Sequence, residues 1–306
     1  MPVPDFQSLT RPVLTALKNG GEMSVVEVCQ QVADAEGLTP EDVSERTRGG
    51  STTKLRDRVS WGITYMMHAG LIERVRRAVY RITPQGEELH SRQPTRIDLK
   101  LLAEYPAYVE WKNQQHRRSS NTGRPGPQGN ESGETPEEKL DRAAEELRTI
   151  LEAEVLARVR DAAPAFLERA VVHLLIAMGY GGGDAAMGRV TGRSGDGGID
   201  GTIREDALGL DEVYVQAKKY ADGNTVGEGD LRNFAGAIDA AGTTKGVFVT
   251  TAGFTRAAKD YVARSPKRIV LIDGEELARL MVRHGIGVRT RVRHEVKRID
   301  EDYFDQ

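Results

Sequence analysis

The chain has 306 residues, 39% of them hydrophobic, which is enough for about two domains with a core each. Charged residues make up 29%, yet the formal net charge is only -3, so total charge neither indicates nor excludes a polyanionic partner. No apolar run approaches the roughly 18 residues that span a bilayer, and the N-terminus lacks a secretory pattern. We therefore expect no membrane partner and a cytoplasmic location, which the single cysteine, Cys29, also favours.

Residues 1–95 are predicted to form three helices followed by a β-ribbon. Apolar residues recur at helical spacing in three segments, 6–17, 25–38 and 55–71. Residues 71–83 then alternate and are rich in β-branched side chains, before Pro84-Gln85-Gly86 turns the chain. This order is typical of the winged helix-turn-helix, whose third helix normally enters the DNA major groove.

Basic residues concentrate on the predicted third helix and ribbon. From Arg46 to Arg81 nine basic residues stand against two acidic ones, a local charge of +7 that suits contact with phosphates. The candidate DNA contacts are Lys54, Arg56, Arg58, Thr64, Arg74, Arg76 and Arg77. A helical wheel adds Asp57, Trp61 and Tyr65, which point away from the apolar face. The alternatives are a solvated basic face or a protein-interaction module. Trp61 fits the edge of a core at least as well as a base contact.

A polar segment from Arg117 to Glu138 separates this unit from the rest. Gly, Pro, Ser and Asn dominate it, so it cannot bury enough surface to offset its ordering entropy, and we interpret it as a flexible linker. Residues 95–116 are predicted to be helical and to pack on one of the two units. The expected division is a winged-helix domain over 1–95, a partly helical and partly disordered linker over 96–140, a catalytic domain over 141–290 and a tail over 291–306.

A second group of candidate residues lies on two predicted strands of the C-terminal unit. The two-residue period of a strand places Gln216 and Lys218 on one face of the second strand. In the first strand Ile199 and Ile203 point together, so Asp200 emerges on the opposite side, among glycines that let a metal ion or phosphate approach. If the two strands pair, Asp200 meets Gln216 and Lys218.

These residue types suit hydrolysis of a phosphodiester. The reaction needs oxygen ligands for a hard divalent ion, and a cation near the attacking water and the developing charge. Asp200 and the side-chain oxygen of Gln216 would hold the ion, and the Ala217 carbonyl could add a ligand. Lys218 would supply the cation.

Several stretches resemble the Mrr branch of the PD-(D/E)xK nuclease superfamily, in which glutamine replaces the acidic residue before the lysine motif. The matching stretches are Phe166-Leu167-Glu168 with Met178-Gly179-Tyr180, then Gly195 to Gly201, Gln216 to Tyr220, and Gly246 to Thr251 with Phe254-Thr255. The N-terminal unit also looks like the winged domain that precedes this nuclease domain in the family. The resemblance implies an α/β fold with a mixed sheet flanked by helices, and Mg2+-dependent cleavage of double-stranded DNA, in many members with a preference for methylated foreign DNA.

Two further carboxylates remain ambiguous. The family often places an acidic residue near the metal at the position of Glu168, which is otherwise a surface or capping carboxylate. Asp196 can assist metal binding, but Gly195-Asp196-Gly197-Gly198 is also a plain turn, the interpretation that we favour.

The predicted function is that of a restriction endonuclease directed at modified, methylated foreign DNA. One site cuts one strand, so double-strand cleavage would need a homodimer or homotetramer. The alternatives are a DNA-binding regulator with an inactive nuclease-like domain, and a repair nuclease that recognises DNA structure. The intact set of Asp200, Gln216 and Lys218 argues against the regulator. No GxxxxGK[ST] motif is present, so we expect no bound nucleotide.

Overall fold

The computed structural model describes residues 2–47, 50, 52–120, 133–191, 199–206, 208, 210–221, 223–297, 299 and 303. The chain divides into two compact units, residues 1–143 with 297–306, and residues 144–296. Within the described ranges, none of the helices has the length and apolar content of a membrane span.

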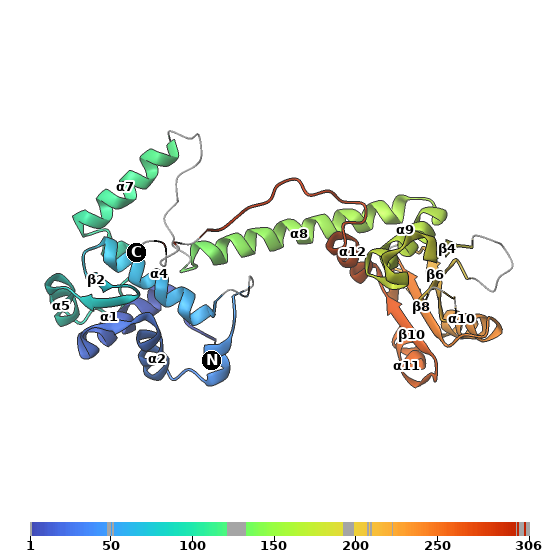
Figure 1. Cartoon of the computed structure of the whole chain (residues 1–306), viewed down its shortest axis with the longest axis horizontal. Coiled ribbons are helices and arrows are strands. Elements are labelled where there is room, and N and C mark those ends of the chain that lie inside the picture. Colours follow the sequence, from blue (N-terminus) through green and yellow to red (C-terminus); the bar gives the residue numbers. More distant parts are fainter. Residues whose placement is uncertain are drawn as a thin grey trace. The chain divides into compact units, whose positions relative to one another are not determined.

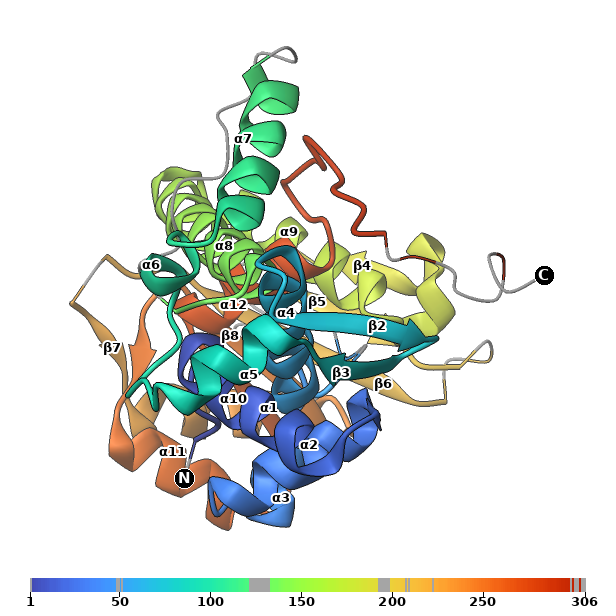
Figure 2. The ribbon, with the colours of Figure 1, turned by 90° about the vertical axis from the view of Figure 1, so that its left-hand side faces the viewer.

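The first unit combines helices with a small sheet. Its elements are α1 (Phe6–Gly20), β1 (Met23–Ser24), α2 (Val25–Ala35), α3 (Pro40–Ser44), α4 (Lys54–His68), β2 (Ile72–Arg76), β3 (Val79–Ile82) and α5 (Pro84–Ser91). The antiparallel sheet has the order β1-β3-β2, and Figure 2 shows the β2–β3 ribbon beside α4. The predicted winged-helix order is confirmed, with α3 as an additional short helix.

Local signals explain where these helices begin. The Asp5 side chain caps α1, Thr53 caps α4, and Ser24 with Glu27 forms a capping box at α2. The apolar faces of the helices then meet in one core. Its most buried side chains include Phe6, Leu14, Val28, Leu55 and Met66.

An aromatic cluster attaches the next helices to α4. These helices are α6 (Leu99–Leu102) and α7 (Pro106–Ser120). Tyr108 and Trp111 of α7 lie 6.3 and 5.9 Å from the ring of Tyr65, between centroids. Trp111 also stacks on His68 at 4.0 Å, and burial lowers the pKa of His68. The segment predicted to be helical over 95–116 therefore packs on the N-terminal unit.

A mixed sheet organises the second unit. Its strands are β4 (Gly188–Val190), β5 (Gly201–Arg204), β6 (Glu212–Lys218), β8 (Lys245–Thr250) and β10 (Arg268–Ile272), and β7 (Thr225–Val226) pairs separately with β9 (Gly253–Phe254). The order is β10-β8-β6-β5-β4, in which β10, β8 and β6 are parallel and β5 and β4 run antiparallel to their neighbours.

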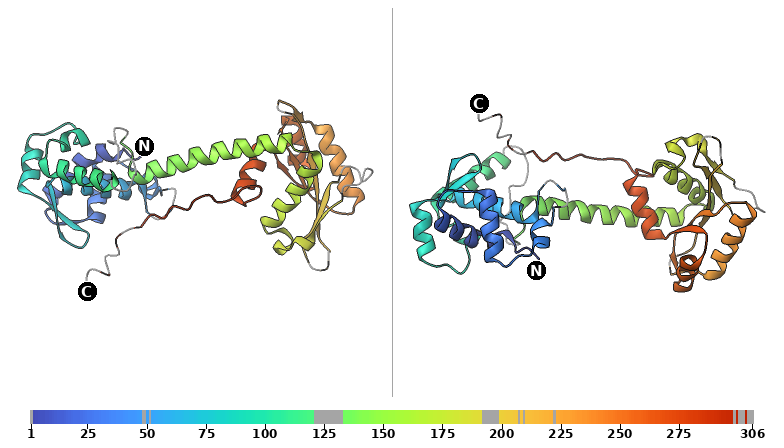
Figure 3. Two further views of the ribbon diagram at one scale, coloured as in Figure 1. Left: turned by 90° about the horizontal axis from the view of Figure 1, so that it is seen from above. Right: turned by 60° about the horizontal axis from the view of Figure 1, so that its bottom comes forward.

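Helices cover both faces of this sheet, as the predicted fold requires. They are α8 (Pro136–Asp161), α9 (Pro164–Ala177), α10 (Glu228–Ala240), α11 (Arg256–Arg264) and α12 (Gly274–Arg283). One core joins α8, α9 and α12 to the face that carries Val215 and Val247, and the other joins α10 and α11 to the face that carries Phe248. Figures 1 and 3 show α10 and α11 on the side of the sheet away from α12.

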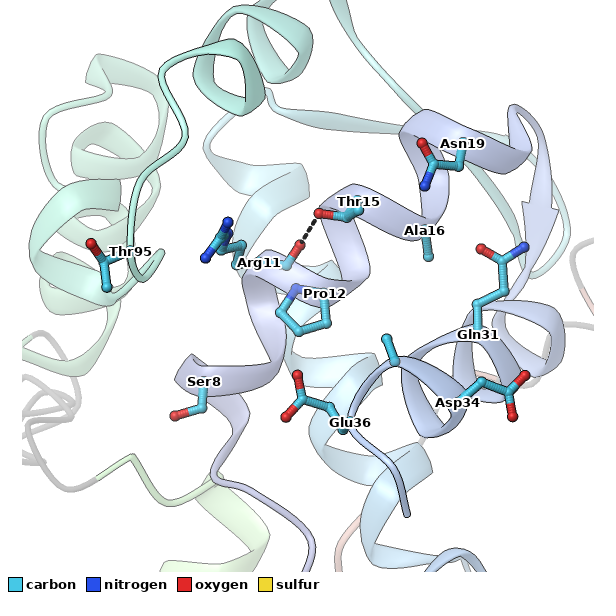
Figure 4. Close-up of a pocket in the computed structure, with 11 residues that line it drawn as sticks. Ser8, Arg11, Pro12, Thr15, Ala16, Asn19, Gln31, Asp34, Glu36 and Thr95 are labelled. Carbon is cyan, nitrogen blue, oxygen red and sulfur yellow. Dashed lines mark hydrogen bonds between the residues drawn. The ribbon is translucent and has the colours of Figure 1, made fainter. Parts of the chain in front are cut away.

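A hollow of about 470 Å³ lies between α1 and α2 (Figure 4). Its lining includes Arg11, Asp34 and Glu36, and the Thr15 hydroxyl donates a hydrogen bond to the Arg11 carbonyl at 3.0 Å. None of the candidate site residues lines it, so we assign it no part in the chemistry.

Candidate active site and nucleic-acid interface

Strand pairing brings the predicted catalytic residues together. β5 pairs antiparallel with β6, with Gly201 opposite Val215, which places Asp200 beside the end of β6. The Asp200 amide donates to the Val215 carbonyl at 2.9 Å, and the Ala217 amide donates to Asp200 Oδ2 at 2.7 Å. The expected pairing of the two strands therefore occurs, and the Asp200 carboxylate lies against the segment from Gln216 to Lys218.

The Asp200 carboxyl group is costly to ionise. Burial raises its pKa to about 6, the Ala217 amide and the Lys218 ammonium lower it, and the negative charge of Glu168 raises it. Glu168 of α9 therefore acts on the site electrostatically, and its contact with a metal stays a prediction. A divalent cation next to Asp200 would favour the ionised form.

Gln216 presents a buried polar atom without a partner. The residue is 8% exposed, and its Oε1 has no hydrogen bond in the structure as described. Leaving such an atom unsatisfied costs about 1–3 kcal/mol. A hard cation beside Asp200 would satisfy it, so the residues fit a divalent ion. No group of three or more His, Cys, Asp or Glu side chains suited to a metal occurs in the described ranges, which makes the amide oxygen important.

Lys218 pairs with a carboxylate that the sequence analysis does not single out. Its Nζ donates to Oδ1 of Asp230, in the first turn of α10. Burial tends to lower the pKa of Lys218, but Asp230 and Tyr220 together outweigh that effect and raise it. The Gly227-to-Asp230 spacing is a helix-start signal, yet the approach of Asp230 to Lys218 depends on how α10 packs on the sheet. The remaining candidate, Asp196, lies outside the described residues.

The predicted DNA contacts lie on α4 and on the β2–β3 ribbon. Those with exposed side chains are Arg56, Arg74, Arg76 and Arg77. The prediction is wrong for Tyr65, because its side chain is buried in the core of the N-terminal unit. Lys54 forms an ion pair with Glu45 at 2.5 Å, and the Thr64 hydroxyl donates to the Ser60 carbonyl at 2.9 Å. The ribbon and one side of α4 thus present positive charge to solvent.

Two other polar side chains of α4 are held by the start of α8. Arg58 forms an ion pair with Glu138 at 2.6 Å, donates to the Pro4 carbonyl at 3.0 Å, and has a side chain only 18% exposed. Trp61 donates from Nε1 to Glu137 at 2.7 Å. Trp61 packs against the core of this unit, in agreement with the alternative that places it at a core edge.

The end of the segment predicted to be a flexible linker makes these contacts. α8 begins at Pro136, Thr135 is fully buried, and the Thr135 hydroxyl donates to Asp57 at 2.9 Å. Composition does not reveal this contact because its partners are polar side chains, including Glu137 and Glu138, and not an apolar stripe.

Comparison with known proteins identifies the family. A family described as "Restriction endonuclease" matches residues 159–281, and one described as "Mrr N-terminal domain" matches residues 6–92. The chain is 35% identical over 312 residues to "Type IV methyl-directed restriction enzyme EcoKMrr" of Escherichia coli (strain K12), with 100% of both sequences covered. The chain belongs to the Mrr family of restriction endonucleases. In this Mrr chain, the segment that matches the restriction-endonuclease family contains Asp200, Gln216 and Lys218.

Two solved restriction enzymes are similar to part of the Mrr chain. "MspJI Restriction Endonuclease in Complex with 27-mer Oligonucleotide" is 22% identical with a TM-score of 0.33, over 42% of this chain and 31% of that one. "DNA modification-dependent restriction endonuclease AspBHI" is 23% identical with a TM-score of 0.37, over 46% and 36%. The chain thus covers about a third of each enzyme, and the family assignment rests on the sequence matches.

Removing the charge of Asp57 should change how the stability of the Mrr N-terminal unit depends on pH. Burial raises the pKa of Asp57 to about 6, while the Thr135 hydroxyl lowers it and Glu137 and Glu138 raise it. The folded state therefore binds the Asp57 proton more tightly than the unfolded state, so the contribution of Asp57 to stability is greatest below about pH 4 and is lost as pH rises through 6. Asp57→Asn should abolish this decline.

The expected effect is about 1 kcal/mol or less, because water partly screens this side chain. Urea unfolding of the first unit at pH 4, 5, 6 and 7 measures it. Asp34→Asn, at an exposed position on α2, is the control and should leave the pH profile unchanged. If the free energy of unfolding fell no more between pH 4 and 6 in the wild type than in Asp57→Asn, the predicted effect of Asp57 would be contradicted.

Proposed function

We propose that this Mrr-family chain is a Mg2+-dependent endonuclease that hydrolyses phosphodiester bonds in modified, methylated double-stranded DNA. The observation that carries the proposal is the buried, unpartnered Oε1 of Gln216, on the strand that bears Lys218 and whose Ala217 amide bonds to Asp200. The description of the E. coli relative as methyl-directed supports a modified target.

In the proposed site three oxygens hold the ion, from the side chains of Asp200 and Gln216 and from the Ala217 carbonyl. When bound, the ion supplies a Lewis acid that activates water and offsets charge on the phosphate. Glu168 adds negative charge near Asp200, which favours a cation there. Lys218 holds an ammonium group where negative charge develops on the phosphate during cleavage.

DNA reading is assigned to α4 and the β2–β3 ribbon. The exposed arginines at positions 56, 74, 76 and 77 suit phosphate contacts. Lys54 and Arg58 already have carboxylate partners, which a phosphate would have to replace, and Thr64 would have to give up its bond to Ser60. Because one site cuts one strand, cleavage of both strands would use a homodimer or homotetramer.

Incubation of the purified protein with methylated and unmethylated duplex DNA, in Mg2+ or in EDTA, tests the proposal on a gel. We expect cleavage of methylated DNA in Mg2+ and none in EDTA. Cleavage that persists in EDTA would remove the metal from the proposal, and equal cleavage of both DNAs would remove the dependence on modification. Binding without cleavage would indicate an inactive regulator, and cleavage of branched DNA alone would indicate a repair nuclease.

A further inference from the structure

Lys218 lies near two carboxylates but is hydrogen-bonded to only one of them in the described structure. Its Nζ donates to Oδ1 of Asp230, on α10. Asp200, on the other side, accepts a hydrogen bond at Oδ2 from the Ala217 amide, the residue before Lys218. The two carboxylates therefore have different partners: Asp230 binds the Lys218 ammonium group, and Asp200 binds the backbone through one oxygen.

Both oxygens of the Asp230 carboxylate accept hydrogen bonds. Its Oδ2 accepts the Gly227 amide at 3.2 Å, which closes the first turn of α10. The next residue, Leu231, is fully buried and packs with Phe234 in the core between α10 and the sheet. Because backbone and core hold this carboxylate, it can fix the flexible Lys218 side chain with little further ordering of its own.

We infer that Asp230 is a positioning residue for DNA cleavage: it holds the Lys218 ammonium on the α10 side of the site and so leaves the Asp200 carboxylate available to a divalent cation. The inference rests on the proposed function of the site. In this arrangement the oxygens of Asp200 and Gln216 would bind the cation, while the Lys218 ammonium would remain free to interact with the phosphate.

The alternative arrangement shows why this separation matters. A partly buried ammonium group that loses its partner pairs with the next available carboxylate, because an unpaired buried charge is costly. For Lys218 we expect that carboxylate to be Asp200, which accepts the amide of the preceding residue, Ala217, at 2.7 Å. An ion pair between Lys218 and Asp200 would occupy the oxygen that the cation needs.

Two substitutions separate the charge of Asp230 from its helix-capping role. Asp230→Asn keeps an oxygen for the Gly227 amide but removes the charge, and Asp230→Glu keeps the charge on a longer side chain. The matched control is Glu228→Gln in the same turn of α10, because Glu228 pairs with Arg232 at 2.6 Å and not with Lys218.

The first measurement is the 15N NMR signal of the Lys218 ammonium group in the metal-free full-length protein, assigned with Lys218→Arg. We expect the signal to shift in Asp230→Asn and to stay in place in Glu228→Gln. An unchanged signal in Asp230→Asn would overturn the inference. This measurement needs neither DNA nor metal, so its result holds even if the wild type cleaves no DNA, an outcome that would reject the proposed function alone.

The second measurement separates catalysis from binding. In single-turnover reactions Asp230→Asn should lower the cleavage rate by about ten- to a hundredfold and leave the Kd for DNA within about twofold, since Lys218 is asked to act in the transition state. Asp230→Glu should recover part of the rate, because it restores the charge. Wild-type cleavage in Asp230→Asn, or a loss confined to DNA affinity, would show that Asp230 does not position the lysine.

Discussion

Lys218→Ala and Asp200→Ala should each lower the single-turnover rate of DNA cleavage by at least about a thousandfold. The first variant removes the ammonium that offsets developing charge, and the second removes the carboxylate that accepts the Ala217 amide next to Gln216. DNA affinity should change by less than about threefold, because the exposed arginines of α4 and the β2–β3 ribbon belong to the other unit.

The neighbouring residue provides a matched control for this prediction. Lys219 donates from Nζ to the Ala162 carbonyl at 2.6 Å and has no contact with Asp230, so Lys219→Ala should keep most of the cleavage rate. Gel cleavage and DNA binding by anisotropy measure both quantities on the same samples. If either site variant cleaved DNA at the wild-type rate, the substituted residue would not be catalytic. If DNA binding fell together with cleavage, the nuclease unit would contribute to DNA affinity.

Gln216→Leu should stabilise the second unit while it abolishes Mg2+-dependent cleavage. Leucine has a similar volume and removes the unpartnered Oε1 from a position that is 8% exposed, so the free energy of unfolding should rise by about 1–3 kcal/mol. The same change deletes a proposed ligand of the ion, so Mg2+ affinity should fall at least about tenfold. Calorimetric unfolding and Mg2+ titration measure the two effects separately.

Gln7 of the first unit is the control for Gln216. Gln7 is also buried, at 6% exposure, but its Oε1 accepts the Leu99 amide at 3.0 Å. Gln7→Leu should therefore destabilise its unit, by about 1–3 kcal/mol, because it leaves a backbone donor without a partner. If Gln216→Leu also destabilised, the Gln216 amide would have to be satisfied in the folded protein, and unchanged Mg2+ affinity would remove it from the ligand set.

The parts of the site that the sequence predicts correctly depend on local geometry. The two-residue period of β6 places Gln216 and Lys218 on one face whatever the rest of the chain does, and Asp200 directly precedes the adjoining strand β5. The winged-helix order is likewise carried by short-range periodicity and by capping residues such as Ser24 and Thr53.

The parts that the sequence does not predict depend on contacts between distant polar groups. Asp230 reaches Lys218 because Leu231 and Phe234 seat α10 on the sheet, an arrangement that neither segment encodes alone. Thr135 is fully buried at the end of a segment whose composition indicates a linker, because it bonds to the Asp57 carboxylate. Ion pairs and hydrogen bonds between side chains far apart in the sequence follow no sequence period, so such contacts appear only in the folded chain.

The contacts between α4, α7 and the start of α8 also give the chain an intrinsic optical reporter. Its two tryptophans, Trp61 and Trp111, both lie in the N-terminal unit, where Trp61 bonds to Glu137 and Trp111 stacks on His68. Fluorescence excited at the red edge of protein absorption therefore arises from this unit alone, while the nuclease unit contributes only tyrosine emission at shorter wavelengths. Departure of Glu137 would expose the Trp61 indole to water and move its emission to the red, so the state of α4 can be followed without attaching any dye.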